Sequence, residues 1–371
     1  MQLPYSSDLQ TEYLSRLFDN KSECYKLFWF QALLGKITEG KDVITYEELV
    51  NEMIADSWYM VTEYHLNLGP KDNLEAAVKY LSQLSGIKSS EKKDKILDFL
   101  ARCQDKEFLR LKKVLIDNVP YRLQAPFLPD IKGREWDCSK EELAQKINRE
   151  QRLLYYFDKI QGLQTTVRIN TEWKNYFIRN QEILRGWIQY NMITYLQKRN
   201  PSVPGISDKL YPPQMRNLDK VKKFWKMRLE ICPVNDIYGN INITKDNISI
   251  DHFVPWSYVA HDEMWNLHPT TSNINSSKNN SLPAWDKYFP LLSQQEYESY
   301  QLIGKYDRLH DEFEKCAKAH LNSDDVRFRL YRDGQSLEEF QNELSSIIYP
   351  VYCSAKNCGF EEWVYQNGQN N

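Results

Sequence analysis

The chain has 371 residues and a formal net charge of −3, with 42% hydrophobic and 27% charged residues. This length is enough for two or three domains, and the composition is typical of a globular protein and excludes a wholly disordered one. The small net charge argues against a protein that coats nucleic acid non-specifically, so any affinity for phosphate groups has to come from a local patch.

The cysteines and the first residues indicate in which cellular compartment the protein is located. Seven cysteines form an odd, scattered set without the spacing of a disulfide framework. The opening residues, MQLPYSSDLQ, carry no basic stretch followed by an apolar one, and no apolar run approaches a membrane span in length. We therefore expect a cytoplasmic protein with reduced thiols and no membrane partner.

Residues 1–200 have the apolar spacing of a helical domain, in two sub-blocks joined near residues 120–138. The proline-rich stretch 119–130 is expected to be a turn or an extended connector, because proline lacks the N–H that a helix uses. A long helix is expected from about residue 172 to 199. Its stripe of large apolar side chains predicts a core face or a partner interface.

Capping boxes mark several expected helix starts. In each, a Ser or Thr can accept the backbone N–H three residues later, where a Glu can bond back to it. They begin at Thr45, Ser139, Ser293 and Ser336.

Two proline-containing stretches, 200–205 and 211–213, make the best domain boundary in the sequence. We therefore expect a helical domain at 1–200, a second domain at 214–290 and a C-terminal helical region at 291–371.

The most basic short run, KVKKFWKMR at residues 220–228, begins the second domain. On a helix, Lys222, Lys223 and Lys226 would line one face, which could guide a phosphate backbone. The alternative is a solvated helix surface without a ligand.

The segment at 248–283 carries the most informative pattern, ISIDHFVPWSYVAHDEMWNLHPTTSNINSSKNNSLP. A strand-like run ends on Asp251 and His252, Asn266 follows fourteen residues later, and Asn275 lies nine residues further on. Lys278 is three residues beyond Asn275, on the same face of an expected helix.

These residue types suit the hydrolysis of a phosphodiester. The negative charge of that group repels nucleophiles, so cleavage needs a deprotonated water and a cation at the transition state. His252 is the natural base because an unperturbed imidazole, with a pKa of about 6.5, is available in its neutral form at physiological pH. A carboxylate and an amide oxygen are ligands that a hard divalent cation prefers. The alternative is a polar loop that matches by chance.

The order of these residues resembles the HNH nuclease family, which has a ββα-metal fold, over about residues 229–283. The resemblance implies that His252 takes a proton from the attacking water. It implies that Asp251 and Asn275 hold one Mg²⁺ or Mn²⁺, and that cleavage leaves 5′-phosphate and 3′-hydroxyl ends.

Further roles follow from the same resemblance. Asn266 would hold the loop between the strands and keep the histidine ring aimed, and Lys278 would contact the phosphate. His268, on the second strand, either faces solvent, packs in the fold or touches the substrate.

Many members of that family also carry two Cys-x-x-Cys pairs that bind a structural zinc. Here the first pair retains only Cys232, with Asn235 in place of the second thiol, and positions 271 and 274 have no cysteine. We therefore expect no structural zinc.

The sequence thus predicts a mainly α protein with a small embedded ββα-metal nuclease module. The expected activity is metal-dependent cleavage of DNA, in an effector of a bacterial anti-phage or restriction system with an ATPase or sensor as its partner. The alternatives are a ribonuclease or toxin-like effector, and a non-catalytic scaffold that only binds nucleic acid.

Overall fold

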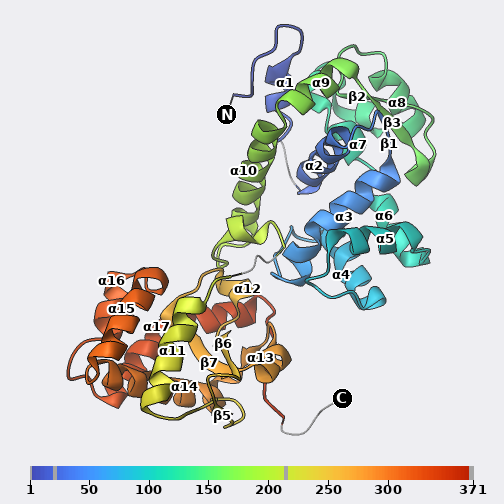
Figure 1. The fold of residues 1–371 in the computed structure, drawn as a ribbon. Coiled ribbons are helices and arrows are strands. Elements are labelled where there is room, and N and C mark those ends of the chain that lie inside the picture. Colours follow the sequence, from blue (N-terminus) through green and yellow to red (C-terminus); the bar gives the residue numbers. More distant parts are fainter. Residues whose placement is uncertain (1, 20–22, 213–215, 367–371) are drawn as a thin grey trace. The chain divides into compact units, whose positions relative to one another are not determined.

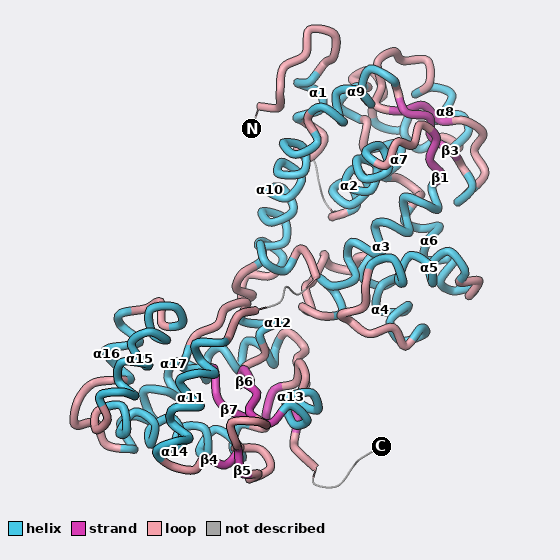
Figure 2. The backbone as a smooth tube through the Cα atoms, in the orientation of Figure 1, coloured by secondary structure: helices cyan, strands magenta, loops and turns pink. Residues whose placement is uncertain are grey.

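The computed structural model describes residues 2–19, 23–212 and 216–366. The chain divides into an N-terminal unit, formed by residues 1–201 and 210–212, and a C-terminal unit, formed by 202–209 and 213–371 (Figure 1). The fold is mainly α-helical with short strands, as the sequence predicts (Figure 2). Among the described residues, no helix has both the length and the apolar character that a membrane crossing requires.

The N-terminal unit consists of helices around a small antiparallel sheet. Its α-helices are α1 (Thr11–Ser15), α2 (Tyr25–Thr38), α3 (Tyr46–Thr62), α4 (Asn73–Ser85), α5 (Lys93–Arg102), α6 (Lys106–Leu115), α7 (Val119–Arg122), α8 (Lys140–Ile147), α9 (Thr171–Arg179) and α10 (Gln181–Arg199), and its 3₁₀ turns are η1 (Ala125–Phe127), η2 (Gly133–Asp137) and η3 (Gly162–Gln164). The sheet has the order β1 (Val43–Thr45), β3 (Thr166–Ile169), β2 (Tyr155–Phe157). Its core is rich in aromatic residues, and Trp29, Trp58 and Trp173 are fully buried.

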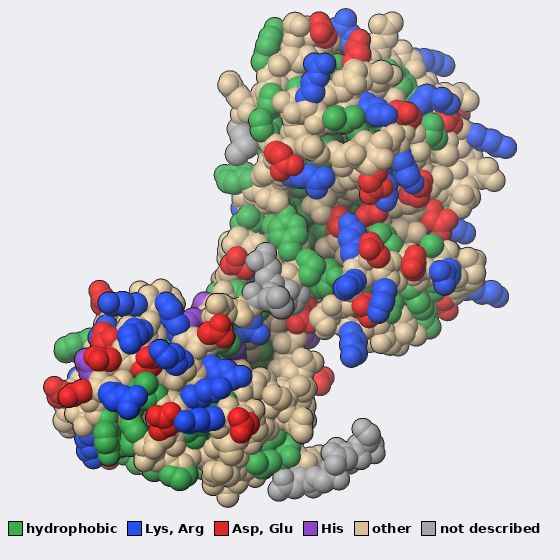
Figure 3. Space-filling view, viewed as in Figure 1, with side chains coloured by type: hydrophobic (Ala, Val, Ile, Leu, Met, Phe, Trp, Pro, Cys, Tyr) green, Lys and Arg blue, Asp and Glu red, His purple; other side chains and the backbone are tan. Residues whose placement is uncertain are grey.

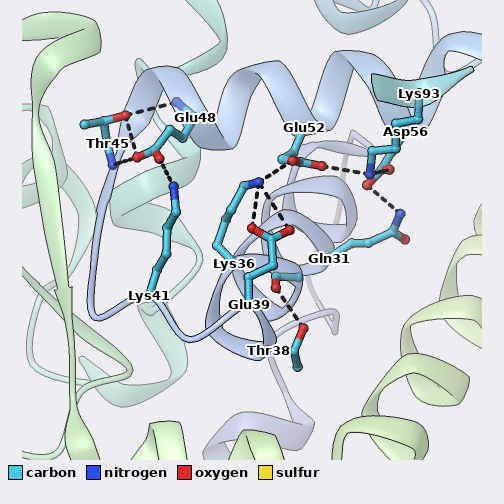
Figure 4. A network of polar contacts seen from close by, with 11 residues as sticks. Gln31, Lys36, Thr38, Glu39, Lys41, Thr45, Glu48, Glu52, Asp56 and Lys93 are labelled. Carbon is cyan, nitrogen blue, oxygen red and sulfur yellow. Dashed lines mark hydrogen bonds and ion pairs between the residues drawn. The ribbon is translucent and has the colours of Figure 1, made fainter. Parts of the chain in front are cut away.

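A polar network joins α2, α3 and α5 inside this unit (Figure 4). Glu52 of α3 accepts from Lys36 of α2 at 2.5 Å and from Lys93 of α5 at 2.7 Å. Asp56, one turn along α3, accepts from Lys93 at 2.5 Å and from the amide of Gln31 at 2.8 Å. Because each carboxylate has more than one donor, their poorly hydrated charges are compensated and the three helices are held together.

Two expectations for this unit need correction. The helix expected from about residue 172 to 199 is two helices, because Asn180 leaves the helical conformation with φ −112° and ψ 18°. Trp173 and Leu184 on either side of this break are fully buried, so the apolar stripe is a core face. The proline-rich connector contains the helix α7, which tolerates Pro120 because N–H groups in the first turn have no partner within a helix.

Three of the four expected capping boxes are confirmed as helix N-caps. The side chains of Thr45, Ser139 and Ser336 each accept the backbone N–H three residues later. The prediction for Ser293 is wrong, because this residue is buried within a helix and its hydroxyl donates to the carbonyl of Pro290.

The C-terminal unit surrounds a short hairpin with helices. Its helices are η4 (Ile206–Lys209), α11 (Asp219–Ile231), α12 (Trp256–Val259), η5 (Met264–Asn266), α13 (Ser272–Lys278), α14 (Trp285–Ile303), α15 (Asp307–His320), α16 (Asp324–Leu330) and α17 (Leu337–Asn357). Its strand pairs are β4 (Val234–Asn235) with β5 (Asn242–Ile243), β6 (Ile248–His252) with β7 (Leu267–Thr271), and β8 (Leu282–Pro283) with β9 (Glu362–Trp363).

The expected ββα unit is formed by β6, β7 and α13. The strands pair antiparallel with Asp251 opposite His268, and α13 begins directly after β7, with Thr271 as its N-cap. Ile248 and Ile250 of β6 share a core with α11 and with α15. The hairpin is thus packed against helices, and it belongs to the same core as residues beyond 291.

Candidate active site

A cavity of about 290 Å³ lies at the end of β6, within the C-terminal unit. It is lined by Arg216, Ile250, Asp251, His252, Pro255, Trp256, Asn275, Ser276, Lys278, Asn279 and Asn280. The predicted residues Asp251, His252, Asn275 and Lys278 therefore share one cavity. Neighbouring residues in a regular strand face opposite ways, but β6 ends at His252, so both members of the acid–histidine pair reach the cavity.

His252 lies between a carboxylate and a guanidinium group. Its Nε2 is 2.8 Å from Oδ1 of Asp262. Nη1 of Arg216 is 3.2 Å from Nδ1 and 3.5 Å from Nε2, so the guanidinium lies beside the ring rather than on the lone pair of one nitrogen. An ionised carboxylate only accepts hydrogen bonds, so Asp262 assigns the proton to Nε2 and leaves the lone pair on Nδ1. Burial lowers the pKa of His252; the Asp262 carboxylate opposes this shift and Arg216 adds to it. The ring is thereby kept in the neutral form that a general base requires.

Asp251 is buried and surrounded by donors. Its Oδ2 accepts from the Tyr238 hydroxyl at 2.7 Å and lies 3.4 Å from Nε2 of His268. The ammonium of Lys278 is 3.2 Å from Oδ1 and 3.1 Å from Oδ2. Burial alone would raise the pKa of Asp251, but Lys278, His268 and Tyr238 together hold this pKa below its usual value. The carboxylate of Asp251 is therefore ionised, which is the form that binds a metal cation.

His268 and Lys278 lie deeper than the sequence predicts. His268 is fully buried and its Nε2 lies 3.0 Å from the Tyr238 hydroxyl, so the structure does not support a direct contact with nucleic acid. Lys278 is also fully buried and donates to the backbone carbonyl of His252 at 2.7 Å as well as to Asp251. Because Lys278 lines the cavity, its contact with a phosphate stays a prediction.

Asn266 fixes the loop that follows His252. Its side chain is fully buried, accepts the backbone N–H of Val254 at 2.7 Å and donates to the carbonyl of the same residue at 2.8 Å. Two bonds to one residue hold the backbone two positions after His252. Such an arrangement suits the expected positioning role, which acts on the histidine from a distance.

Asn275 presents an oxygen donor to the cavity wall. Its amide nitrogen donates to the Ser249 hydroxyl at 3.0 Å and to the Ile250 carbonyl at 3.1 Å, so Oδ1 is the side-chain atom that a cation would need. No cluster of three or more His, Cys, Asp and Glu side chains that could enclose a metal occurs among the described residues. The carboxylate of Asp251 and the amide oxygen of Asn275 fit an open site for a hard cation, completed by substrate and water.

The predicted basic face is only partly available. Lys222, Lys223 and Lys226 lie on α11, but Lys223 pairs with Glu312 of α15 at 3.0 Å. None of the three lines the cavity, and Figure 3 shows Lys and Arg mixed with Asp and Glu on this face of the C-terminal unit. Binding of nucleic acid by these lysines stays a prediction.

The sequence pattern did not single out Arg216, Asp262 or Tyr238. Asp262 lies ten residues after His252, in the loop between the strands, and Arg216 precedes α11. No local spacing connects either residue to the histidine, because packing alone brings them to it. For Asp262 the only sequence signal was an acidic residue in the loop that follows His252, and for Arg216 and Tyr238 there was none.

The comparison with protein families agrees with this geometry. Residues 236–284 match the family described as HNH endonuclease, which confirms the expected resemblance for this segment. The match includes β6, β7, α13 and Asp262, but not Arg216. No curated protein and no solved structure matches the chain.

Proposed function

We propose that this chain, whose residues 236–284 carry an HNH endonuclease domain, is a metal-dependent endonuclease that cleaves DNA. The observation that carries the proposal is His252, a buried neutral imidazole that shares a cavity with one carboxylate and one amide oxygen. This combination supplies a base for water and two ligands for a hard cation.

Each residue of the site has its own role in the proposed reaction. Nδ1 of His252 accepts a proton from the attacking water, while Asp262 accepts the Nε2–H bond and stabilises the imidazolium that forms. Asn266 keeps the backbone after His252 in place. Asp251 and Asn275 would hold one Mg²⁺ or Mn²⁺, which supplies positive charge for the phosphate oxygens and the departing 3′-oxygen.

A cleavage assay that varies both the nucleic-acid substrate and the metal ion tests this proposal. Supercoiled DNA and structured RNA are incubated with Mg²⁺ or Mn²⁺, with and without a chelator. We expect cleavage of DNA that the chelator abolishes. Cleavage of RNA alone would replace DNA by RNA as the substrate, and binding without cleavage of either polymer would contradict the nuclease assignment in favour of a scaffold.

The metal ligands are tested separately. Asn275→Ala should shift the metal titration of cleavage to higher concentration, because one of two protein oxygens is lost. The matched control is Asn279→Ala, at a residue that lines the same cavity and is not a proposed ligand. An unchanged titration in Asn275→Ala would exclude Asn275 as a ligand. A role in anti-phage defence or restriction, and an ATPase or sensor partner, stay predictions from the sequence.

A further inference from the structure

Lys278 binds the same carboxylate that the proposed function assigns to a metal ion. Its ammonium is 3.2 Å from Oδ1 and 3.1 Å from Oδ2 of Asp251, and it donates to the backbone carbonyl of His252 at 2.7 Å. The ammonium therefore has three oxygen partners, and all of them belong to the last two residues of β6. Carboxylate and carbonyl oxygens are also the ligands that a hard divalent cation prefers.

The other contacts of Asp251 leave few lone pairs for a second cation. Its Oδ2 also accepts from the Tyr238 hydroxyl at 2.7 Å and lies 3.4 Å from Nε2 of His268. A carboxylate offers about four lone-pair positions, and these donors together with the ammonium of Lys278 use most of them. A metal ion that binds Asp251 would therefore share Oδ1 with Lys278, at a range where two positive charges repel each other.

The charges around the cavity are balanced within the protein. Among the described residues that line the cavity, Asp251 is the one carboxylate, and Arg216 and Lys278 are the cations. Asp262, which bonds to His252, lies 3.8 Å from Arg216, so this second carboxylate has a cation of its own. A divalent cation adds two positive charges to this arrangement, and it gains a carboxylate only if an ammonium or guanidinium group gives one up.

We propose that the ammonium of Lys278 competes with the metal ion for Asp251, so that the site binds metal weakly by itself. Metal binding requires the ammonium to release at least one oxygen of Asp251. A phosphate group in the cavity favours this release, because it offers Lys278 another anion. Metal and phosphate should therefore strengthen the binding of each other. The assignment of Asp251 as a metal ligand rests on the proposed function, whereas the position of Lys278 rests on its contacts.

Titration with Mn²⁺ tests the competition without relying on cleavage, because the signal of free Mn²⁺ in electron paramagnetic resonance reports binding directly. Lys278→Met removes the charge and keeps an unbranched side chain, and Lys278→Arg keeps the charge. We expect Lys278→Met to bind Mn²⁺ about 5- to 150-fold more tightly than the wild type, the usual size of a coupling between two ligands. Lys278→Arg should not gain affinity, and the added substitution Asp251→Asn should remove the gain of Lys278→Met.

Three results of this titration would overturn the competition. The first is equal affinity in the wild type and Lys278→Met, including no binding in either. The second is weaker binding in Lys278→Met, which would show that the ammonium supports the metal ion. The third is a gain that Lys278→Arg shares or that Asp251→Asn leaves in place, because the charge of Lys278 or the carboxylate of Asp251 would then not be its cause.

A measurement on the wild type decides the question if Lys278→Met fails to fold. Acetic anhydride acylates amines, and peptide mass spectrometry locates the modified residues. Lys278 is fully buried against Asp251, so Mn²⁺ should accelerate its acylation about two- to tenfold, the effect of losing one ordinary hydrogen bond. Lys305, an exposed residue between α14 and α15, is the internal reference and should react equally with and without Mn²⁺. An unchanged or slower reaction of Lys278 would overturn the release of the ammonium.

The two proposals fail in different ways. If Lys278→Met gains affinity for Mn²⁺ but neither DNA nor RNA is cleaved, the competition stands and the nuclease assignment falls. If cleavage requires metal while the affinity and the acylation rate do not change, the nuclease assignment stands and Lys278 only compensates the charge of Asp251.

Discussion

Each unit has a group of charged side chains beside a cavity. The two groups differ in whether their charges are paired with one another. In the N-terminal unit one cavity has a volume of about 410 Å³, and Glu52 and Asp56 form part of its wall. Lys36 lies between Glu39 and Glu52, and Lys93 lies between Glu52 and Asp56 (Figure 4). These opposite charges satisfy one another, so this cluster stabilises the packing of helices.

The smaller cavity in the C-terminal unit has a different character. Asp251 is held ionised by the donors around it, and His252 lines the cavity as a neutral imidazole with the partly exposed Arg216 beside its ring. Ionisable groups in a cavity whose pKa values are shifted by burial and by neighbouring charges are typical of an active site. We therefore base the choice of the candidate active site on the state of the charged groups around each cavity and not on cavity size.

The sharpest test of this comparison is His252→Ala. Loss of a general base should reduce kcat by about 10²–10⁴-fold, with little change in the melting temperature. The control is His310→Ala, because His310 is exposed and outside the cavity. Cleavage assays and thermal unfolding on both variants measure the effect, and retained cleavage in His252→Ala would refute the base assignment.

The converse test is Glu52→Gln in the N-terminal unit. Removing the buried carboxylate between Lys36 and Lys93 should lower the free energy of unfolding by about 2–3 kcal/mol, since two cations lose a partner. Cleavage per folded molecule should not change. Glu39→Gln is the matched control, because Glu39 also pairs with Lys36 but is 54% exposed, and its loss should cost at most about 1 kcal/mol. Denaturant unfolding compares the two, and equal costs would contradict the structural role of Glu52.

Asp262→Ala probes a residue that acts through His252. Without the acceptor for Nε2–H, the ring loses its fixed tautomer, and kcat should fall about 10–100-fold while KM changes little. Asp262→Asn should retain more activity, because its side-chain oxygen can still accept that bond. An equal loss in both variants would indicate that the carboxylate charge, rather than the hydrogen bond, is what His252 needs.

The smallest expected effect concerns Glu296 of α14. Burial raises the pKa of Glu296 to about 8, although Arg228 opposes this shift, and its Oε1 has no hydrogen-bond partner among the described residues. The folded protein keeps this proton up to about pH 8, whereas the unfolded chain loses it near pH 4.3, so the residue makes stability fall as pH rises between these values.

Glu296→Gln should therefore be more stable than the wild type by about 1–2 kcal/mol at pH 8, with a smaller difference at pH 5. Glu298→Gln, on the same helix but half exposed, is the control variant. Denaturant unfolding at both pH values measures the difference. A gain that is the same at pH 5 and pH 8 would show that the carboxyl group is not responsible.

Much of the fold was predictable because it depends on local spacing. Caps such as Thr45 and Ser336 follow from side chains that bond three residues away. Ser293 has the same pattern but is buried inside α14, because tertiary packing outweighs a cap worth about 1 kcal/mol. The boundary of a separate region at 291–371 stays a prediction.

The sequence by itself determined the ββα module, because Asp251, His252, Asn266 and Asn275 lie at intervals that one hairpin and one helix convert directly into proximity. Only the tertiary structure decided what surrounds the histidine. Arg216 and Asp262 reach it through packing of segments that no periodicity links, and Lys278 turns toward Asp251 because a buried carboxylate needs a compensating charge.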